Sequence, residues 1–461
     1  MYFEQFYLGC LAHASYLLAS EGEAVVVDPQ RDVELYLEAA AGHGLTIRHI
    51  FETHLHADFV SGHKELAART GATIYIGAQA GAQFPHVPVS DGFELKFGKA
   101  SIRVLETPGH TPESICLVVT DREKSIAPWA VLTGDTLFIG DVGRPDLSPR
   151  HTSAQLAGML YDSLHTKLLT LPDNVLVYPA HGAGSLCGKN MRAERSSTIG
   201  TERLTNYALQ IKDREEFTAQ LTSNLPARPE YFMKDAEINR TGAAFLSELP
   251  ALRAIEPAEL NRMLKEGEIA LDVRSGEEFA AGHVPGSINI ALSGQFASWA
   301  GTVLGLTVHP VLIADTEQQI EEARVRLARV GMEALDGYLS GGVPAWKHAG
   351  LPVAQTDQIT AEELYSRIHA NDSQVLDVRR QAEWDAGHIE GAAWWPLDNF
   401  KVSPPEINRD VPLAVHCKSG YRSMIASSLL ERAGFHHILN VVGGFDAWQQ
   451  AKLPVVTAIT A

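Results

Sequence analysis

Cysteine is scarce in this chain, with four residues among 461, at positions 10, 116, 187 and 417. Thiols so few and so widely spaced exclude the disulfide framework of a small secreted domain and favour a reducing compartment. No apolar run reaches the roughly 18 residues of a membrane-spanning helix. Residues 1–9 lack the basic start of a secretory signal. We therefore expect a cytoplasmic protein that does not bind a membrane.

Positive charge is also in short supply. The chain has 38 Lys and Arg against 56 Asp and Glu, which gives a net charge of −18. A protein with this negative net charge would repel the phosphate backbone over most of its surface, so nucleic acid is not an expected partner. Hydrophobic residues make up 45% of the chain, and at about 150 residues per domain its length favours three globular domains.

The second half of the chain contains an internal repeat. Three pairs of segments match: Leu271–Arg274 with Leu376–Arg379, Ala281–Gly286 with Ala386–Gly391, and Ser340–Trp346 with Val442–Trp448. Within each copy, short β-branched runs alternate with helical stretches, which is typical of a parallel sheet covered by helices. We therefore predict two copies of one α/β domain, over residues 250–356 and 357–461.

The first half reads as a separate domain of residues 1–249. Short apolar strands separated by helices and Gly/Pro turns are expected near residues 25–28, 50–53, 73–76, 102–105, 115–119, 131–133 and 175–178. Residues 191–249 look mainly helical. Several of the strands stop at a histidine or an aspartate.

Residue types that bind metals collect at the ends of these strands. His54, His56 and Asp58 share one loop, and His110, Asp135 and His181 follow later strands. A lone histidine is more often structural than a ligand. Polar groups on several rigid strand ends can nevertheless converge on one ion, so the ordered set predicts a metal site.

This ordered set resembles the metallo-β-lactamase superfamily over roughly residues 1–235. In its dinuclear members, including glyoxalase II thioester hydrolases, the first motif runs His-x-His-x-Asp-His. Here Phe59 follows Asp58, and a phenyl ring has no lone pair for a second metal. The segment Gly134–Asp146 is similar to the persulfide dioxygenase branch, in which two histidines and one aspartate hold a single Fe(II).

The resemblance implies an N-terminal αββα sandwich with one Fe(II) per chain. Its ligands would be His54, His110 and Asp135, which leave positions for O₂ and sulfur. His56, Asp58 and His181 would orient these ligands or line the pocket. The alternative is that all six residues bind two zinc ions for thioester hydrolysis.

Cys187 and Lys189 lie in the loop that follows His181. Cys187 resembles a cysteine of persulfide dioxygenases fused to rhodanese domains, where it could carry persulfide sulfur, with Lys189 stabilising the thiolate. A structural free cysteine is the other interpretation. Glutathione-using relatives commonly have an aromatic residue after this histidine, whereas this chain has Gly182. The carrier thiol, whether glutathione, coenzyme A or another, therefore stays open.

Cys417 begins a loop between an apolar strand and a helix in the last copy, and Arg422 closes it. Loop N–H groups and the positive helix end would stabilise an anionic sulfur at such a position. The pattern resembles the active loop of the rhodanese family, over about residues 357–461. The resemblance implies Cys417 as the catalytic sulfur carrier, and a binding set for its anionic partners composed of Lys418, Ser419, Gly420 and Arg422.

The middle copy lacks this thiol. Cys417 precedes Gly434 by 17 residues, and at the same distance before Gly331 stands Ala314. The acidic Asp315 in the same loop would repel an anionic sulfur species. The copy therefore resembles inactive rhodanese-like domains, so we expect an inactive domain followed by an active one.

Together these features predict a persulfide dioxygenase with sulfurtransferase activity that serves sulfide detoxification. A low-molecular-weight thiol persulfide would react with O₂ to give sulfite, and Cys417 would form or use thiosulfate. A glyoxalase II-like hydrolase with sulfurtransferase domains is the competing enzyme. A non-enzymatic sulfur-sensing or docking assembly is the third hypothesis. The oligomeric state, a homo-oligomer included, is left open.

Overall fold

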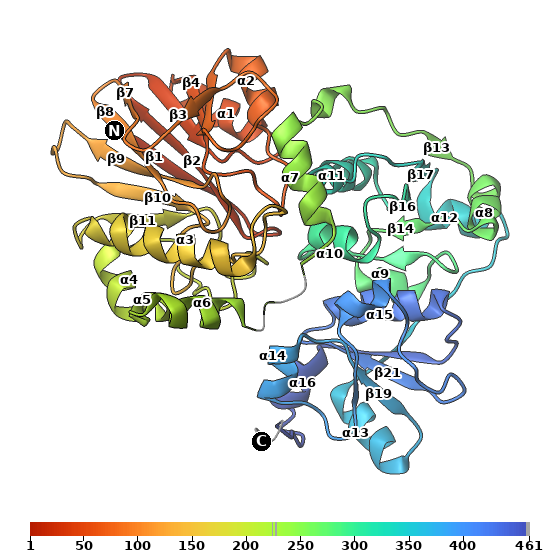
Figure 1. Cartoon of the computed structure of the whole chain (residues 1–461). Coiled ribbons are helices and arrows are strands. Elements are labelled where there is room, and N and C mark those ends of the chain that lie inside the picture. The colour runs from red at the N-terminus through yellow and green to blue at the C-terminus, as the bar shows by residue number, and fades with distance from the viewer. Residues whose placement is uncertain (224, 226–227, 458–461) are drawn as a thin grey trace. The chain divides into compact units, whose positions relative to one another are not determined.

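The computed structural model describes residues 1–223, 225 and 228–457, which form two units (Figure 1). The first unit contains Met1–Leu249 together with Ala328–Gly331. The second contains the other residues from Pro250 onward. Among the residues described, no helix is long and apolar enough to cross a membrane.

Two six-stranded sheets build the first unit. The first has its strands adjacent in chain order: β1 (Tyr2–Leu8), β2 (His13–Ser20), β3 (Glu23–Val27), β4 (Thr46–Glu52), β5 (Thr73–Gly77) and β6 (Val87–Val89). The second has the order β12-β11-β10-β9-β8-β7: β7 (Glu94–Phe97), β8 (Ala100–Glu106), β9 (Ile115–Asp121), β10 (Ala130–Gly134), β11 (Leu176–Pro179) and β12 (Ser197–Thr198). Strands β3 to β6 run parallel, as do β10 and β11, whereas β7 to β10 are antiparallel.

Alternating side chains give each sheet two buried faces. On β2, Tyr16 and Leu18 point into the core between the sheets and meet Ile102 of β8. Leu17, between them, points outward and packs with Tyr36 of the covering helix α1. The two sheets therefore pack face to face, and each needs helices on its outer side.

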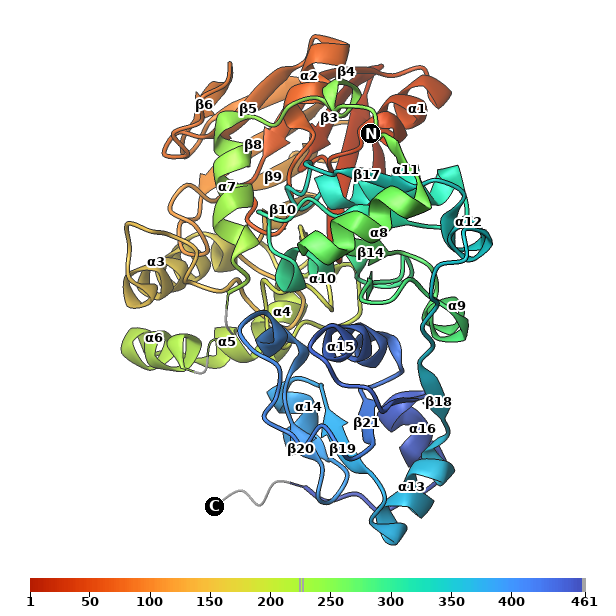
Figure 2. The same ribbon diagram turned by 90° about the vertical axis from the view of Figure 1, so that its right-hand side faces the viewer.

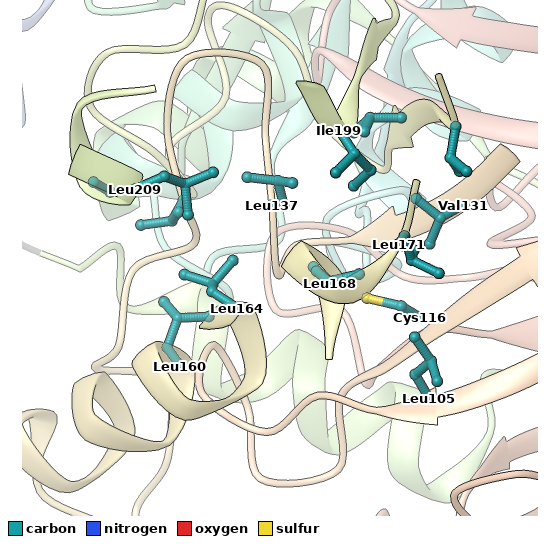
Figure 3. Packing of buried hydrophobic residues seen from close by; sticks show 14 of the residues in the cluster. Leu105, Cys116, Val131, Leu137, Leu160, Leu164, Leu168, Leu171, Ile199 and Leu209 are labelled. Atoms are coloured by element: carbon teal, nitrogen blue, oxygen red, sulfur yellow. The ribbon is translucent and has the colours of Figure 1, made fainter. Parts of the chain in front are cut away.

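Helices cover both outer faces (Figure 1). On the first sheet lie α1 (Glu34–Gly42) and α2 (His63–Thr70). On the second lie α3 (Ser153–Thr166), η1 (Leu168–Thr170), α4 (Ile199–Thr205), α5 (Tyr207–Gln210) and α6 (Arg214–Thr222). Figure 3 shows Leu160 and Leu164 of α3 in this outer core, which also holds Cys116. Burial raises the pKa of the Cys116 thiol to about 11.

Two further segments, α7 (Tyr231–Thr241) and η2 (Leu246–Glu248), follow the sandwich in the chain. The predicted αββα sandwich is confirmed.

The second unit contains the two repeats. The middle copy is built from β13 (Ala254–Ile255), α8 (Pro257–Glu266), β14 (Ala270–Asp272), α9 (Gly276–Ala281), β15 (Ile288–Asn289), α10 (Phe296–Val303), β16 (Val311–Ile313), α11 (Glu317–Ala328), β17 (Gly337–Leu339) and α12 (Gly342–His348). The last copy is built from β18 (Asp357–Ile359), α13 (Ala361–Ala370), β19 (Gln374–Asp377), α14 (Gln381–Ala386), β20 (Ala393–Trp394), η3 (Leu397–Lys401), β21 (Leu413–His416), α15 (Tyr421–Arg432), β22 (Ile438–Val441) and α16 (Gly444–Gln450). Both sheets are parallel, with orders β13-β17-β16-β14-β15 and β18-β22-β21-β19-β20. These orders are equivalent strand by strand, which confirms the predicted parallel-sheet repeats.

In the last copy, α13 and α16 pack on one face of the sheet (Figure 2). Val375, Ala414 and Leu439 point to that face. Because strand side chains alternate, Val415 points to the other face, where α15 contacts β21 and β22. Helix α15 starts directly after the Cys417 loop, so its packing sets the position of that loop.

The matched motif of the repeats contains a buried ion pair. Arg274 Nη2 lies 2.6 Å from Asp272 Oδ2, and the same distance joins Arg379 to Asp377. Arg274 also donates to the Gly282 carbonyl, as Arg379 does to Gly387. The motif thus ties the ends of β14 and β19 to the glycines that end the helices α9 and α14.

Candidate metal centre and sulfur loop

Three predicted ligands meet in the first unit. His54 follows β4, His110 follows β8 and Asp135 follows β10, and one ligand atom from each lies within 4.8 Å of the other two. Asp135 Oδ2 is 3.8 Å from His54 Nε2 and 3.4 Å from His110 Nε2. All three side chains are buried.

These atoms fit a metal ion. His54 Nε2, His110 Nε2 and Asp135 Oδ2 have no hydrogen-bond partner among the residues that the structure describes. The other ring nitrogens are occupied: His110 Nδ1 donates to the Arg144 carbonyl at 2.9 Å. His54 Nδ1 lies 3.0 Å from Thr53 Oγ1, whose own proton goes to Asp28. The Nε2 lone pair of each histidine is therefore free to bind a cation. In metal sites, a hydrogen bond at the other ring nitrogen usually orients a histidine in this way.

Electrostatics keep this set ready for a cation. Burial holds the pKa of His54 well below its ordinary value and lowers that of His110. Burial alone would raise the pKa of Asp135, but the imidazoles of His181, His110 and His54 outweigh it and hold that pKa well below its usual range. Neutral imidazoles and an ionised carboxylate are the forms that bind metals.

His181 connects two carboxylates. Its Nδ1 lies 2.7 Å from Asp135 Oδ1 and its Nε2 lies 2.9 Å from Asp58 Oδ2. Burial alone would lower the pKa of His181, but Asp135 and Asp58 raise it well above its ordinary value. The protonated ring therefore donates to Asp135 and forms an ion pair with Asp58, which fixes the two carboxylates relative to each other.

Cys187 joins this second cluster, with one ligand atom each from Asp58 and His181 within 4.8 Å. Burial, followed by the charges of Asp58 and Asp135, raises the pKa of Cys187 well above its ordinary value. The structure does not bring the Lys189 ammonium to this thiol: Lys189 Nζ donates to the Ser223 carbonyl at 2.7 Å. The hypothesis that Lys189 stabilises a thiolate therefore has no support from this contact.

His56 belongs to a cluster other than that of the three ligands, with Asp28 and Glu52. Its Nε2 lies 3.2 Å from Asp28 Oδ1 and 3.6 Å from Glu52 Oε2. The Phe59 ring packs 4.4 Å from the His56 ring and 4.1 Å from that of His13, between centroids. The sequence reasoning missed His13 and Glu52. His13 could have been noticed in the sequence as a histidine at the start of an otherwise apolar strand.

Two glycines allow these loops to approach one another. Gly134 has φ +52°, and a Cβ there would lie 2.6 Å from Thr53 Oγ1. A Cβ at Gly143 would lie 2.0 Å from the Asp135 carbonyl oxygen. Any side chain at either position would push the ligand loops apart.

The Cys417 loop of the second unit is built differently. Cys417 is buried directly after β21, and the Gly420 amide donates to its sulfur at 3.2 Å. Lys418 and Ser419 are exposed, and α15 begins one residue after Gly420. The sulfur thus lies against a backbone amide and a helix N-terminus, both of which favour negative charge.

Arg422 is already paired within the protein. Its guanidinium contacts both carboxylate oxygens of Glu383, on α14, at 2.7 Å each. Burial alone would raise the pKa of Glu383, but Arg422 outweighs it and the pKa falls below its ordinary value. Arg422 therefore links α15 to α14 as well as lying near Cys417.

The corresponding loop of the middle copy is filled by a side chain. Ala314 follows β16, and Gln319 Oε1 accepts the amides of Asp315 at 2.9 Å and Thr316 at 3.2 Å. A Cβ on Gly342 would lie 2.5 Å from the Ala314 carbonyl oxygen, as one on Gly444 would lie 2.4 Å from that of Cys417. Ala314 and Cys417 are therefore structurally equivalent, but the amides near Ala314 have an internal partner.

Known proteins match both parts of the chain. The metallo-beta-lactamase superfamily model matches residues 8–181, and the rhodanese-like domain model matches residues 256–349 and 360–451. The mitochondrial persulfide dioxygenase ETHE1 of Bos taurus is 33% identical over 210 residues, which cover 44% of this chain and 73% of that protein. A hydroxyacylglutathione hydrolase of Rhodospirillum rubrum is 36% identical over 244 residues, covering 52% and 86%.

A solved structure extends the likeness over more of the chain. The metallo-beta-lactamase from Staphylococcus aureus subsp. aureus COL has a TM-score of 0.66 at 32% identity, and the match covers 74% of this chain and 98% of that one. The sandwich with its strand-end ligands is that of a metalloenzyme fold. The chain belongs to the metallo-β-lactamase superfamily, and two rhodanese-like domains follow that domain.

Removing one ligand tests the metal site. We expect His110→Ala to retain less than about a tenth of the metal bound by the wild type, because Nε2 of His110 is one of three converging donors. Metal per chain is measured by elemental analysis after anaerobic purification. His43→Ala, at an exposed position, is the control and should bind metal normally. Equal metal content in both variants would contradict the assignment.

Proposed function

We propose that the first unit is a persulfide dioxygenase that holds one Fe(II) through His54, His110 and Asp135. The observation that carries this proposal is the set of three converging, unpartnered ligand atoms beside Phe59, which deprives a second metal of a ligand. When bound, Fe(II) supplies the redox chemistry by which O₂ oxidises sulfur. The likeness to a persulfide dioxygenase supports this choice.

The proposed overall reaction is R–S–SH + O₂ + H₂O → R–SH + SO₃²⁻ + 2 H⁺, where R–SH is a low-molecular-weight thiol. His181 holds protons at Nδ1 and Nε2 and so fixes Asp135 and Asp58 beside the pocket. The buried ligand set keeps bulk water from the reacting sulfur. The absence of an aromatic residue at Gly182 leaves glutathione, coenzyme A and other thiols as carriers.

The last copy would act as a thiosulfate sulfurtransferase in the same pathway. The proposed step is Cys417–S–SH + SO₃²⁻ → Cys417–SH + S₂O₃²⁻, or its reverse. The Gly420 amide and the N-terminus of α15 would stabilise the persulfide anion. Lys418 and Ser419, both exposed, would meet the incoming anion together with Arg422. Together the two activities would remove sulfide.

Metal analysis combined with oxygen uptake tests the proposal. Protein purified without oxygen should contain one iron per chain, and it should consume O₂ and release sulfite when glutathione persulfide or coenzyme A persulfide is added. The likeness to a hydroxyacylglutathione hydrolase favours one specific alternative. Two zinc ions per chain, with glutathione thioester hydrolysis and no O₂ uptake, would establish that alternative instead.

The two rhodanese-like copies should differ in activity. We expect Cys417→Ser to remove essentially all transfer of sulfur from thiosulfate to cyanide, because the middle copy has Ala314 and its loop amides bind Gln319. Oxygen uptake with free persulfide should be unchanged. Substantial residual transfer that is lost on altering the middle loop would contradict this assignment.

Cys187 is proposed to deliver sulfur by the exchange Cys187–S⁻ + R–S–SH → Cys187–S–SH + R–S⁻. Cys187→Ser should then lower dioxygenase turnover by more than about 100-fold with normal iron content. Mass spectrometry should find an added sulfur on Cys187 of the wild type after anaerobic persulfide treatment. Because the pKa of Cys187 is raised, its labelling should accelerate as pH rises.

A smaller effect would exclude this delivery step. If Cys187→Ser keeps activity within about tenfold, or about 1.4 kcal/mol of activation free energy, and only Cys417 takes up sulfur, Cys187 merely lines the pocket. Cys116→Ser is a matched control, because Cys116 is equally buried but lies in the outer core.

A further inference from the structure

Asn239 makes an unusual set of contacts for a residue of the helical extension. It lies on α7, beyond the residues 8–181 that the superfamily model matches. Its side chain is 1% exposed. Its Nδ2 donates to the carbonyls of His56 and Phe59, at 2.7 Å each, and its Oδ1 accepts the Ser61 amide at 2.8 Å.

These three backbone groups lie on both sides of Asp58. A carboxamide is suited to them, because one planar group provides two donated protons and one accepting oxygen. An aspartate would keep the acceptor for Ser61 but would have no proton for either carbonyl. Asn239 therefore holds the segment that carries His56 and Asp58 in one conformation.

The helix that carries Asn239 is itself anchored to the same half of the sandwich. The Gln83 amide donates to the Arg240 carbonyl at 2.8 Å. A few residues further on, the Leu246 amide donates to Glu65 Oε2 at 2.8 Å. The chain that carries Asn239 is consequently fixed to this half of the sandwich at two points just after that residue.

We propose that Asn239 is a positioning residue for the metal site: by holding the backbone around Asp58 it sets where Asp58 meets His181, and through His181 where Asp135 presents its free oxygen. The inference rests on the proposed metal centre, although not on iron being the metal. The helical extension would then be part of the site's architecture as well as a connection to the next domain.

The test is Co²⁺ binding to the metal-free full-length chain, followed by visible absorption, which reports ligand geometry. We expect Asn239→Asp and Asn239→Ala to bind Co²⁺ at least about tenfold more weakly than the wild type, as loss of an outer hydrogen-bonding partner does elsewhere, with an altered spectrum. Sulfur transfer by Cys417 in the same samples should be unchanged. Lys234→Ala, an exposed change on the same helix, should match the wild type.

Wild-type Co²⁺ affinity and spectrum in folded Asn239→Asp would overturn the inference. So would loss of the folded first unit in both Asn239 variants, since Asn239 would then serve stability alone. The proposed function can fail separately. If the wild type binds Co²⁺ but its iron-loaded form consumes no O₂ with persulfide, the proposed function is refuted and this inference still holds.

Discussion

The buried carboxylate of Asp135 is the group around which the first unit's site is arranged. One oxygen accepts a hydrogen bond from His181, and the other lies near His54 and His110. A buried charge is tolerated only where neighbours compensate it. Here the compensating rings come from loops after three other strands, so both sheets must bring their ends together correctly. The close approaches at Gly134 and Gly143 follow from that requirement.

The two rhodanese-like copies share one fold and differ in the loop that contains Cys417 or Ala314. Strand order, the buried ion pair and the glycine that contacts the loop carbonyl are the same in both. In the last copy, a backbone amide donates to the Cys417 sulfur. In the middle copy, the Gln319 side chain accepts loop amides. The fold thus provides a place for an anion, and the loop residues determine whether a ligand can use it.

The sequence predicted what local patterns encode. Strands such as β4 and β10, and the ligand loops after them, follow from short apolar runs that stop at polar residues. It did not predict Asn239 or Glu383, because their partners lie far away in the chain and no local pattern specifies a contact across such separations. Proximity in sequence suggested a contact between Lys189 and Cys187, whereas the Lys189 ammonium donates to the Ser223 carbonyl.

Phe59 and the His181 bridge favour the same number of metal ions. A second ion beside Asp58 would compete with His181, whose Nε2 lies 2.9 Å from Asp58 Oδ2. It would therefore have to weaken an ion pair whose histidine also donates a hydrogen bond to Asp135. The ligand that would help to offset this loss in a dinuclear relative is replaced by a phenyl ring packed between His13 and His56. The substitution and the ion pair together support the proposal of a single ion, held by His54, His110 and Asp135.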